Sequence, residues 1–212
     1  MHVDKHVVKM IKEQRGIYIP EKDTATFWGK NFEVREYNKL SLSGKLAIDI
    51  GAHVGIWTRR LAKDFENVIA FEPLRKHVEC HEKNCEGLDN IILHEVALSN
   101  KNGTDTIRTT NFNSGMSTLL EKRKTKNSFT HTIETRTLDS YDLPEMDFIK
   151  IDVEGWEEQV LEGARNTILK YKPMMYIEIW NENVERINNI LSQMEYETTK
   201  ASQHNYICKP KE

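Results

Sequence analysis

The apolar and polar residues of this chain form two kinds of pattern, one typical of strands and one typical of helices, and segments of the two kinds alternate. Short, almost continuous apolar runs are typical of buried parallel strands. Such runs occupy residues 45–50, 67–71, 90–98, 147–152 and 173–179. Between them, apolar residues recur every three or four positions, as they do on one face of a helix. This spacing predicts helices over residues 56–65, 74–85, 156–169 and 184–191.

The regular alternation of strand and helix predicts an α/β fold, with one mostly parallel, doubly wound sheet and helices on both faces. Two short strands, at 196–199 and 205–208, enclose a polar turn and predict a closing hairpin. Residues 99–142 are rich in Thr and Ser, and we interpret them as an excursion before the next core strand. We expect one domain over 41–212, preceded by an N-terminal extension over 1–40 that is a candidate lid.

Charge and composition narrow the class of protein. The 212 residues include 30 Lys plus Arg and 33 Asp plus Glu, for a formal net charge of −3. This balance supplies no concentrated basic face, so we expect no nucleic-acid partner. No run approaches the ~18 apolar residues of a membrane span, and the N-terminus lacks a hydrophobic signal region. The sequence has three cysteines, which is an odd number. Together these features predict a cytoplasmic protein with reduced thiols.

The segment from Asp49 to Gly55 lies where the first strand turns into the first helix. Gly51 allows a sharp turn close to a ligand, and Gly55 allows helix and strand to pack closely. An ordinary strand-to-helix turn can have the same pattern. A dinucleotide loop usually has three glycines that hold a pyrophosphate, whereas His53 takes the middle position here. The acid that opens the loop suits a cationic ligand such as S-adenosylmethionine, which favours methyl transfer.

Glu72 ends the second predicted strand. In the predicted sheet its position is beside the tip of the first strand, where a carboxylate can accept two hydrogen bonds from the vicinal hydroxyls of a ribose. The alternative is an acid that complements the dipole of the following helix. With the glycine loop nearby, we favour the ribose.

Acidic residues end four of the predicted strands, namely Asp49, Glu72, Asp152 and Glu178. Four carboxylates at one rim are costly unless ligands, cations or protons relieve the repulsion, although any one of them could be a helix cap. A hydroxyl acceptor needs a general base, and our catalytic candidates are Asp152 and Glu154, with Glu178 behind them. A divalent cation bridged by Asp152 and Glu178 is conceivable, but with only two visible ligands we predict no metal.

Several of these segments together resemble the FkbM-type methyltransferase family. They are Ala47–Gly55, Phe71-Glu-Pro73, Val96–Ser99, Thr137-Leu-Asp139, Asp147–Glu157 and Val160–Ala164. The resemblance covers roughly residues 40 to 180, and the stretch Ile-Lys-Ile-Asp-Val-Glu-Gly is far more specific than the glycine loop. It implies a class I methyltransferase fold, Rossmann-like, with a seven-stranded mostly parallel sheet and a C-terminal reversed hairpin.

The resemblance also implies where the cofactor binds. Its methionine end would be lined by Asp49, Gly51, Ala52 and Gly55, with Asp152 nearby and with His53 at a position where the family often has Asn. Glu72, next to Pro73, would hold the ribose. The backbone around Val96 and Ala97 would border the adenine.

The implied function is S-adenosylmethionine-dependent O-methylation, with S-adenosylhomocysteine as product. The acceptor would be a hydroxyl of a sugar, polysaccharide or other small natural product, attacking the sulfonium methyl in line while the enzyme holds both partners in near-attack geometry. The alternative is a non-catalytic binding protein on the same fold. An NAD-dependent or nucleotide-sugar oxidoreductase would need the pyrophosphate loop that is missing. The oligomeric state is left open.

Overall fold

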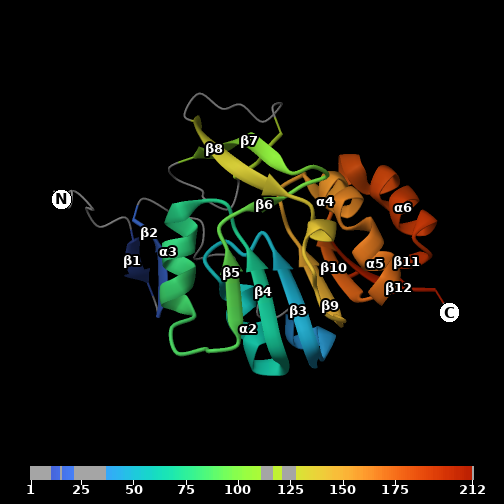
Figure 1. Cartoon of the computed structure of the whole chain (residues 1–212), viewed down its shortest axis with the longest axis horizontal. Coiled ribbons are helices and arrows are strands. Elements are labelled where there is room, and N and C mark those ends of the chain that lie inside the picture. The colour runs from blue at the N-terminus through green and yellow to red at the C-terminus, as the bar shows by residue number, and fades with distance from the viewer. Residues whose placement is uncertain (1–10, 15, 22–36, 111–116, 121–127, 212) are drawn as a thin grey trace.

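A seven-stranded sheet forms the centre of the computed structural model, which describes residues 11–14, 16–21, 37–110, 117–120 and 128–211 (Figure 1). Its strands are β3 (Gly44–Ile50), β4 (Phe65–Phe71), β5 (Ile91–His94), β9 (Phe148–Ile151), β10 (Met174–Glu178), β11 (Tyr196–Lys200) and β12 (Asn205–Pro210). They are ordered β11-β12-β10-β9-β3-β4-β5. The pairs from β5 to β10 are parallel, and β12 runs antiparallel to both β10 and β11. The predicted doubly wound sheet with its reversed hairpin is confirmed.

Helices cover both faces of this sheet because side chains along each strand alternate between them. The helices are α2 (Ile56–Asp64), α3 (Arg75–Asn84), α4 (Glu157–Gly163), α5 (Arg165–Tyr171) and α6 (Val184–Gln193). In β3, Ile48 belongs to the core cluster that contains α4, α5 and α6 residues. The adjacent Ala47 belongs to the cluster that contains Trp57 and Leu61 of α2. The nearly continuous apolar run predicted here is therefore buried on both sides of the sheet.

The register of the parallel strands aligns their C-terminal ends. Ile50 is paired with Phe71 of β4 and with Ile151 of β9, and Ile151 is paired with Ile177 of β10. The residues that follow these positions come out of the sheet in one row. That row consists of Gly51, Glu72, Asp152 and Glu178.

The apolar run over 90–98 is not one strand, as predicted, but two. The chain bends after His94, where the Val96 N–H donates to the His94 carbonyl at 3.0 Å. Beyond the bend, β6 (Ala97–Leu98) joins a second sheet with β7 (Gly103–Thr110) and β8 (Ser128–Arg136), in the order β6-β8-β7. Apolar residues indicate that a segment is buried. They do not show whether that segment is one straight strand or bends into two. The predicted excursion over 99–142 contributes most of this sheet, which lies above the rim of the main one (Figure 1).

The single helix predicted over 156–169 is also two, because it breaks at Ala164 between α4 and α5. The carboxylate of Asp139, in the short 3-10 helix η3 (Leu138–Ser140), accepts the N–H groups of Asn166 and Thr167 at 3.0 and 2.8 Å. These are the donors that a helix N-cap satisfies. The cap comes from a distant part of the sequence, so local periodicity could not reveal the break.

Within the N-terminal extension, the structure describes a hairpin of β1 (Ile11–Gln14) and β2 (Ile17–Pro20). Ile17 and Ile19 pack with Val54 and Cys80, so the hairpin lies against α3 and the loop after β3. Much of the predicted extension, including 1–10 and 22–36, lies outside the described residues. Its role as a lid stays a prediction.

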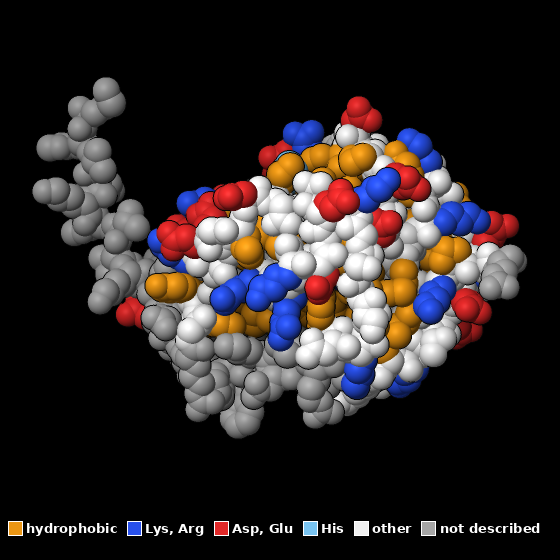
Figure 2. All heavy atoms as spheres, turned by 90° about the horizontal axis from the view of Figure 1, so that it is seen from below, with side chains coloured by type: hydrophobic (Ala, Val, Ile, Leu, Met, Phe, Trp, Pro, Cys, Tyr) orange, Lys and Arg blue, Asp and Glu red, His pale blue; other side chains and the backbone are white. Residues whose placement is uncertain are grey.

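The surface mixes both signs of charge. On the side shown in Figure 2, Lys and Arg side chains occur among Asp and Glu side chains, with apolar groups scattered between them. Within the described part of the chain, Ile92 and Phe129 are the exposed large apolar side chains. None of the helices described has the length and apolar character to cross a membrane.

Candidate active site at the strand tips

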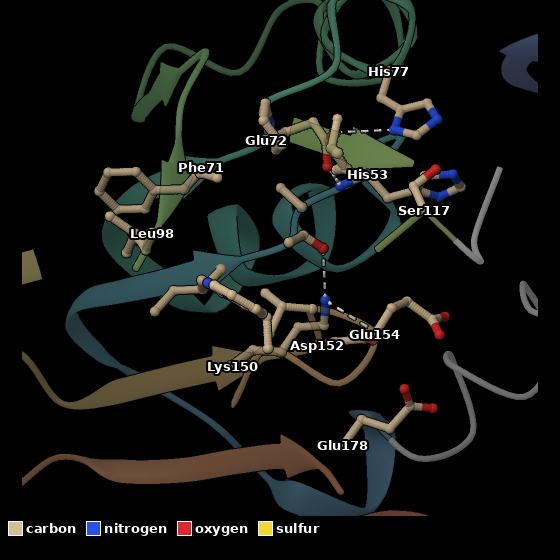
Figure 3. Close-up of a pocket in the computed structure, with 18 of the residues that line it drawn as sticks. His53, Phe71, Glu72, His77, Leu98, Ser117, Lys150, Asp152, Glu154 and Glu178 are labelled. Carbon is tan, nitrogen blue, oxygen red and sulfur yellow. Dashed lines mark hydrogen bonds and ion pairs between the residues drawn. The ribbon is translucent and has the colours of Figure 1, made fainter. Parts of the chain in front are cut away.

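A cavity opens at the rim where the strand tips form a row (Figure 3). Its floor comes from residues at the ends of the strands or just after them, including Gly51, Ala52, His53, Glu72, Pro73, Asp152, Val153, Glu154 and Glu178. Its roof comes from the second sheet and the segment beside it, through Ala97, Leu98, Ile107, Ser117 and Leu119. The wall includes Ile56, Trp57, His77 and Trp156. The cavity therefore lies between the two sheets.

Gly51 is required by the close packing of the loop after β3. Its φ is +76°, and a Cβ atom there would lie 1.9 Å from the carbonyl oxygen of Asp152. The N–H groups of Gly51 and Ala52 both donate to the carbonyl of Phe71 at 3.0 Å. The loop is thus held between the ends of β4 and β9, with no room for a side chain at this position.

Asp49 lies behind the cavity and not in its lining. Its fully buried carboxylate accepts the Thr58 hydroxyl at 2.6 Å and lies 3.3 Å from the Lys150 ammonium. The ring of His81 reaches the same hydroxyl at 2.9 Å. Because Thr58 gives its proton to Asp49, the Nε2 of His81 donates to Thr58. These contacts tie the strand tip to α2 and α3.

Of the other predicted cofactor residues, most line the cavity and two do not. In the described lining are Gly51, Ala52, His53, Glu72, Pro73, Ala97 and Asp152. Gly55 and Val96 are not part of that lining. Gly55 has a φ of +84° and lies against α3, where a Cβ atom would approach the His81 ring to 2.8 Å. Its role in the structure is to allow close packing of the helix that follows.

Lys150 is a cavity residue that the sequence analysis missed. Its ammonium lies 3.3 Å from Asp49 and 3.6 Å from Asp152, and it donates to the Gly51 carbonyl at 3.1 Å. It therefore supplies positive charge among the converging acids. A lysine inside the apolar strand Phe-Ile-Lys-Ile was the available clue, because a buried lysine needs an acidic partner.

Glu72 is buried at the cavity floor, and the protein supplies three donors to its carboxylate. The Leu74 N–H and His77 Nδ1 reach Oε1 at 3.0 and 2.9 Å, and the His53 N–H reaches Oε2 at 3.0 Å. Burial by itself would raise the pKa of Glu72. The charge and hydrogen bond of His77, with smaller contributions from His53 and Leu74, outweigh burial and lower this pKa below its ordinary value.

Three carboxylates gather at the other end of the cavity. One oxygen each from Asp152, Glu154 and Glu178 lies within 4.8 Å of the others. Burial, and then the charges of Asp152 and Glu154, raise the pKa of Glu178 to about 10. Three such carboxylates are a donor set that hard divalent cations accept, one more ligand than the sequence analysis counted. The prediction that the site uses no metal stays a prediction.

Thr118 connects the roof to this acidic end. Its hydroxyl donates to the carbonyl of Glu154 at 2.7 Å, and its backbone exchanges two hydrogen bonds of 2.9 Å with Arg108 of β7. On the same side, the indole N–H of Trp156 donates to the Ser99 hydroxyl at 3.2 Å. The roof is thereby fixed to the segment that carries the candidate bases.

Comparisons with known proteins agree with this arrangement. The Methyltransferase FkbM domain matches residues 49–205. No curated protein matches the chain. A crystal structure of methyltransferase FkbM from Methylobacillus flagellatus KT is 22% identical with a TM-score of 0.52, over 79% of this chain and 43% of that one. This chain thus spans less than half of that protein.

Two further structures match most of both chains. Precorrin-6y C5,15-methyltransferase from Geobacter metallireducens is 13% identical with a TM-score of 0.52, over 86% of this chain and 88% of that one. A DhpI complex with SAH is 9% identical with a TM-score of 0.50, over 89% and 88%. At these identities the likeness concerns the fold, which is that of class I methyltransferases. The family match extends from the glycine loop, through the strand tips that form the cavity, into the final hairpin, and the chain belongs to the methyltransferase FkbM domain family.

Proposed function

We propose that this methyltransferase transfers a methyl group from S-adenosylmethionine to a hydroxyl of a sugar, polysaccharide or other small natural product. The observation that carries the proposal is the row of Gly51, Glu72 and Asp152 along the floor of one cavity. Family membership and the SAH complex of a structure with the same fold support the cofactor. The acceptor class rests on the family resemblance and on the carboxylates at the far end of the cavity.

The residues around the cavity fit the chemical groups of S-adenosylmethionine. Glu72 is a buried carboxylate of lowered pKa, as a charge-assisted hydrogen bond to a ribose hydroxyl requires. Phe71 and Leu98 supply apolar surface on the side where an adenine would lie. Asp152 and the neighbouring acids suit an ammonium and a sulfonium group. When bound, this cofactor supplies an electrophilic methyl group.

The acidic end of the cavity suits activation of an acceptor hydroxyl. Glu178, with a pKa of about 10, holds its proton at neutral pH and can donate a hydrogen bond. We therefore assign the general base to Asp152 or Glu154 and exclude Glu178 from that role. The roof residues Ile107 and Leu119 cover the cavity with apolar side chains that keep water from the reacting groups.

Calorimetric titration with S-adenosylmethionine and S-adenosylhomocysteine tests the proposal. We expect micromolar binding by the wild-type protein and its loss in Glu72→Ala. The milder Glu72→Gln should bind on the order of 10-fold more weakly, because a hydrogen bond to a charged acceptor becomes one to a neutral acceptor. Glu154→Gln is the matched control, and it should keep cofactor affinity while methyl transfer falls.

Each outcome separates the candidate functions. Folded wild-type protein that binds neither ligand would refute the proposed cofactor. Binding without methyl transfer to any hydroxylated acceptor would favour a non-catalytic binding protein. Unchanged methyl transfer in both Asp152→Asn and Glu154→Gln would refute the base assignment. The cytoplasmic location and the absence of a nucleic-acid partner remain predictions.

A further inference from the structure

His77 stands against the carboxylate expected to bind the ribose. It lies in the first turn of α3 and is 1% exposed, yet it forms part of the cavity wall. Its Nδ1 is 2.9 Å from Oε1 of Glu72, and Figure 3 shows this contact beside the loop that carries His53. An ionised carboxylate only accepts hydrogen bonds, so Nδ1 carries the proton and donates it.

The contacts of Glu72 limit what it can offer to a ligand. A carboxylate has about four lone-pair sites, two on each oxygen. Leu74 and His77 occupy both sites of Oε1, and His53 occupies one site of Oε2. Counting the contacts of the described residues, one site remains, and it belongs to Oε2. This differs from the two free acceptors that a bidentate contact to a vicinal diol needs.

His77 also determines the charge of Glu72. Burial of the carboxylate disfavours its ionised form, and the strongest opposing influence comes from His77. The other titratable groups that act on this pair are His53, whose ring contacts the His77 ring, and His81 on α3. Without the Nδ1 donor, a buried carboxylate would lose both a hydrogen bond and the main support for its negative charge.

We propose that His77 is a positioning residue for the cofactor, acting through Glu72. It fixes Oε1 toward α3, keeps the carboxylate ionised, and leaves Oε2 as the acceptor for one ribose hydroxyl. The inference rests on the proposed function. A purely structural role for His77, as packing at the start of α3, makes different predictions.

The variants His77→Asn and His77→Leu separate the two roles. Asn and Leu are similar in size, and both leave the same space, but only Asn places an N–H group near the position of Nδ1. We expect His77→Asn to bind S-adenosylmethionine within about threefold of wild type. We expect His77→Leu to bind on the order of 10-fold more weakly, since it removes a hydrogen bond to a charged group.

The pH dependence of binding gives a readout that packing does not change. In His77→Leu the pKa of Glu72 rises, so the carboxylate takes up a proton as the pH falls toward 5.5, and affinity falls with it. The ratio of the dissociation constants of His77→Leu and wild type should therefore grow between pH 8 and pH 5.5. His53 and His81 are present in both proteins, so the ratio removes the pH effects that the two proteins share.

Analogues of S-adenosylhomocysteine that lack the 2′- or the 3′-hydroxyl test the single acceptor. Loss of one hydroxyl should weaken binding on the order of 10-fold, and loss of the other by much less. Equal losses for both analogues, or equal weakening in His77→Asn and His77→Leu with a constant ratio across pH, would overturn the inference. A wild-type protein that binds neither cofactor nor product would instead refute the proposed function.

Discussion

Glu178 lies half-buried at the tip of β10, where it faces two other carboxylates. Because its pKa is raised to about 10, the folded protein holds a proton there at neutral pH. Asp152 and Glu154 contribute to this shift, so the proton relieves the repulsion among all three acids. The ammonium of Lys150 offsets negative charge on the acids nearer to β3, Asp49 and Asp152. One cation and one proton therefore offset part of the negative charge at the rim before any ligand binds.

The proton on Glu178 makes stability depend on pH. In the unfolded chain this carboxyl ionises near its ordinary value of 4.5, and in the folded protein near 10. Between these values the folded state binds the extra proton, so its contribution is present at low pH and is lost as the pH rises. Glu178→Gln removes this titration. We expect its urea midpoint to fall less than that of wild type between pH 5.5 and pH 9.

The comparison needs both proteins over the same pH series. Parallel declines in the two midpoints would contradict the assigned proton. A stability of Glu178→Gln that rises steadily relative to wild type from pH 5.5 to pH 9 would agree with it, because only wild type loses stability as Glu178 ionises in the unfolded chain.

Individual acids at the rim could be predicted from the sequence, whereas their partners could not. A residue directly after a parallel strand lies at the same edge as all others in that position, which fixes Glu72 and Asp152. The pairing of Lys150 with Asp49 depends on the register between β9 and β3. The contact of His77 with Glu72 depends on where α3 begins. Neither is encoded in the spacing of apolar residues.

At the scale of elements, α5 depends on a residue from another part of the chain. Ala164 occupies its N-cap position and has no side-chain oxygen, so the donors of Asn166 and Thr167 are satisfied by Asp139. Thr137-Leu-Asp139 is one of the segments that resemble the family. The structure gives this aspartate a physical role as a cap supplied from η3.

Asp139→Ala should lower the free energy of unfolding by about 1 kcal/mol, the usual contribution of an N-cap. Asp139→Asn keeps one side-chain oxygen and should lose less. Urea denaturation measures both variants. Cofactor affinity should not change, because this cap lies outside the described lining of the cavity, and a weaker affinity in Asp139→Ala would show that α5 supports the site directly.

At the scale of the whole molecule, the side chain of Asn84 connects the N-terminal hairpin to the loop after β3 by hydrogen bonds, in addition to the apolar contacts of Ile17 and Ile19. The Asn84 amide accepts the Tyr18 N–H at 2.7 Å and donates to the Tyr18 carbonyl at 2.8 Å. It also donates to the Val54 carbonyl at 2.7 Å. Val54 lies between the two glycines of the loop after β3. The first part of the chain therefore braces a loop of the site from behind.

Asn84→Leu keeps the size of this side chain but removes all three hydrogen bonds. Unsatisfied buried groups cost about 1–3 kcal/mol each, so we expect a clear drop in melting temperature. We also expect weaker binding of S-adenosylmethionine, measured by calorimetry at a temperature where the variant is folded. Asn84→Asp retains the acceptor for the Tyr18 N–H, but it places a carboxylate oxygen against the carbonyl oxygens of Tyr18 and Val54, so at neutral pH it should also be clearly less stable than wild type. Lower stability with unchanged affinity would show that the hairpin does not support the loop.

The strands and helices of the main sheet were predictable because each strand–helix unit has its own apolar pattern. The second sheet was not, because its strands mix Thr with charged residues, as in Gly103–Thr110, and alternate only weakly. The break between α4 and α5 and the bend after His94 were missed for a related reason. In each case a residue distant in sequence, Asp139 or Thr135, provides the hydrogen bond or strand pairing that the local segment lacks.

The second sheet is inserted between β5 and β9, and the chain leaves and re-enters the main sheet without changing its strand order. An insertion of this kind has no length imposed on it by the sheet below. Mutations can lengthen, shorten or reshape the roof of the cavity while the parallel strands that carry its floor keep their register. We therefore expect that acceptor specificity can change through this segment, apart from Ala97 and Leu98, without a change in the strand tips below it.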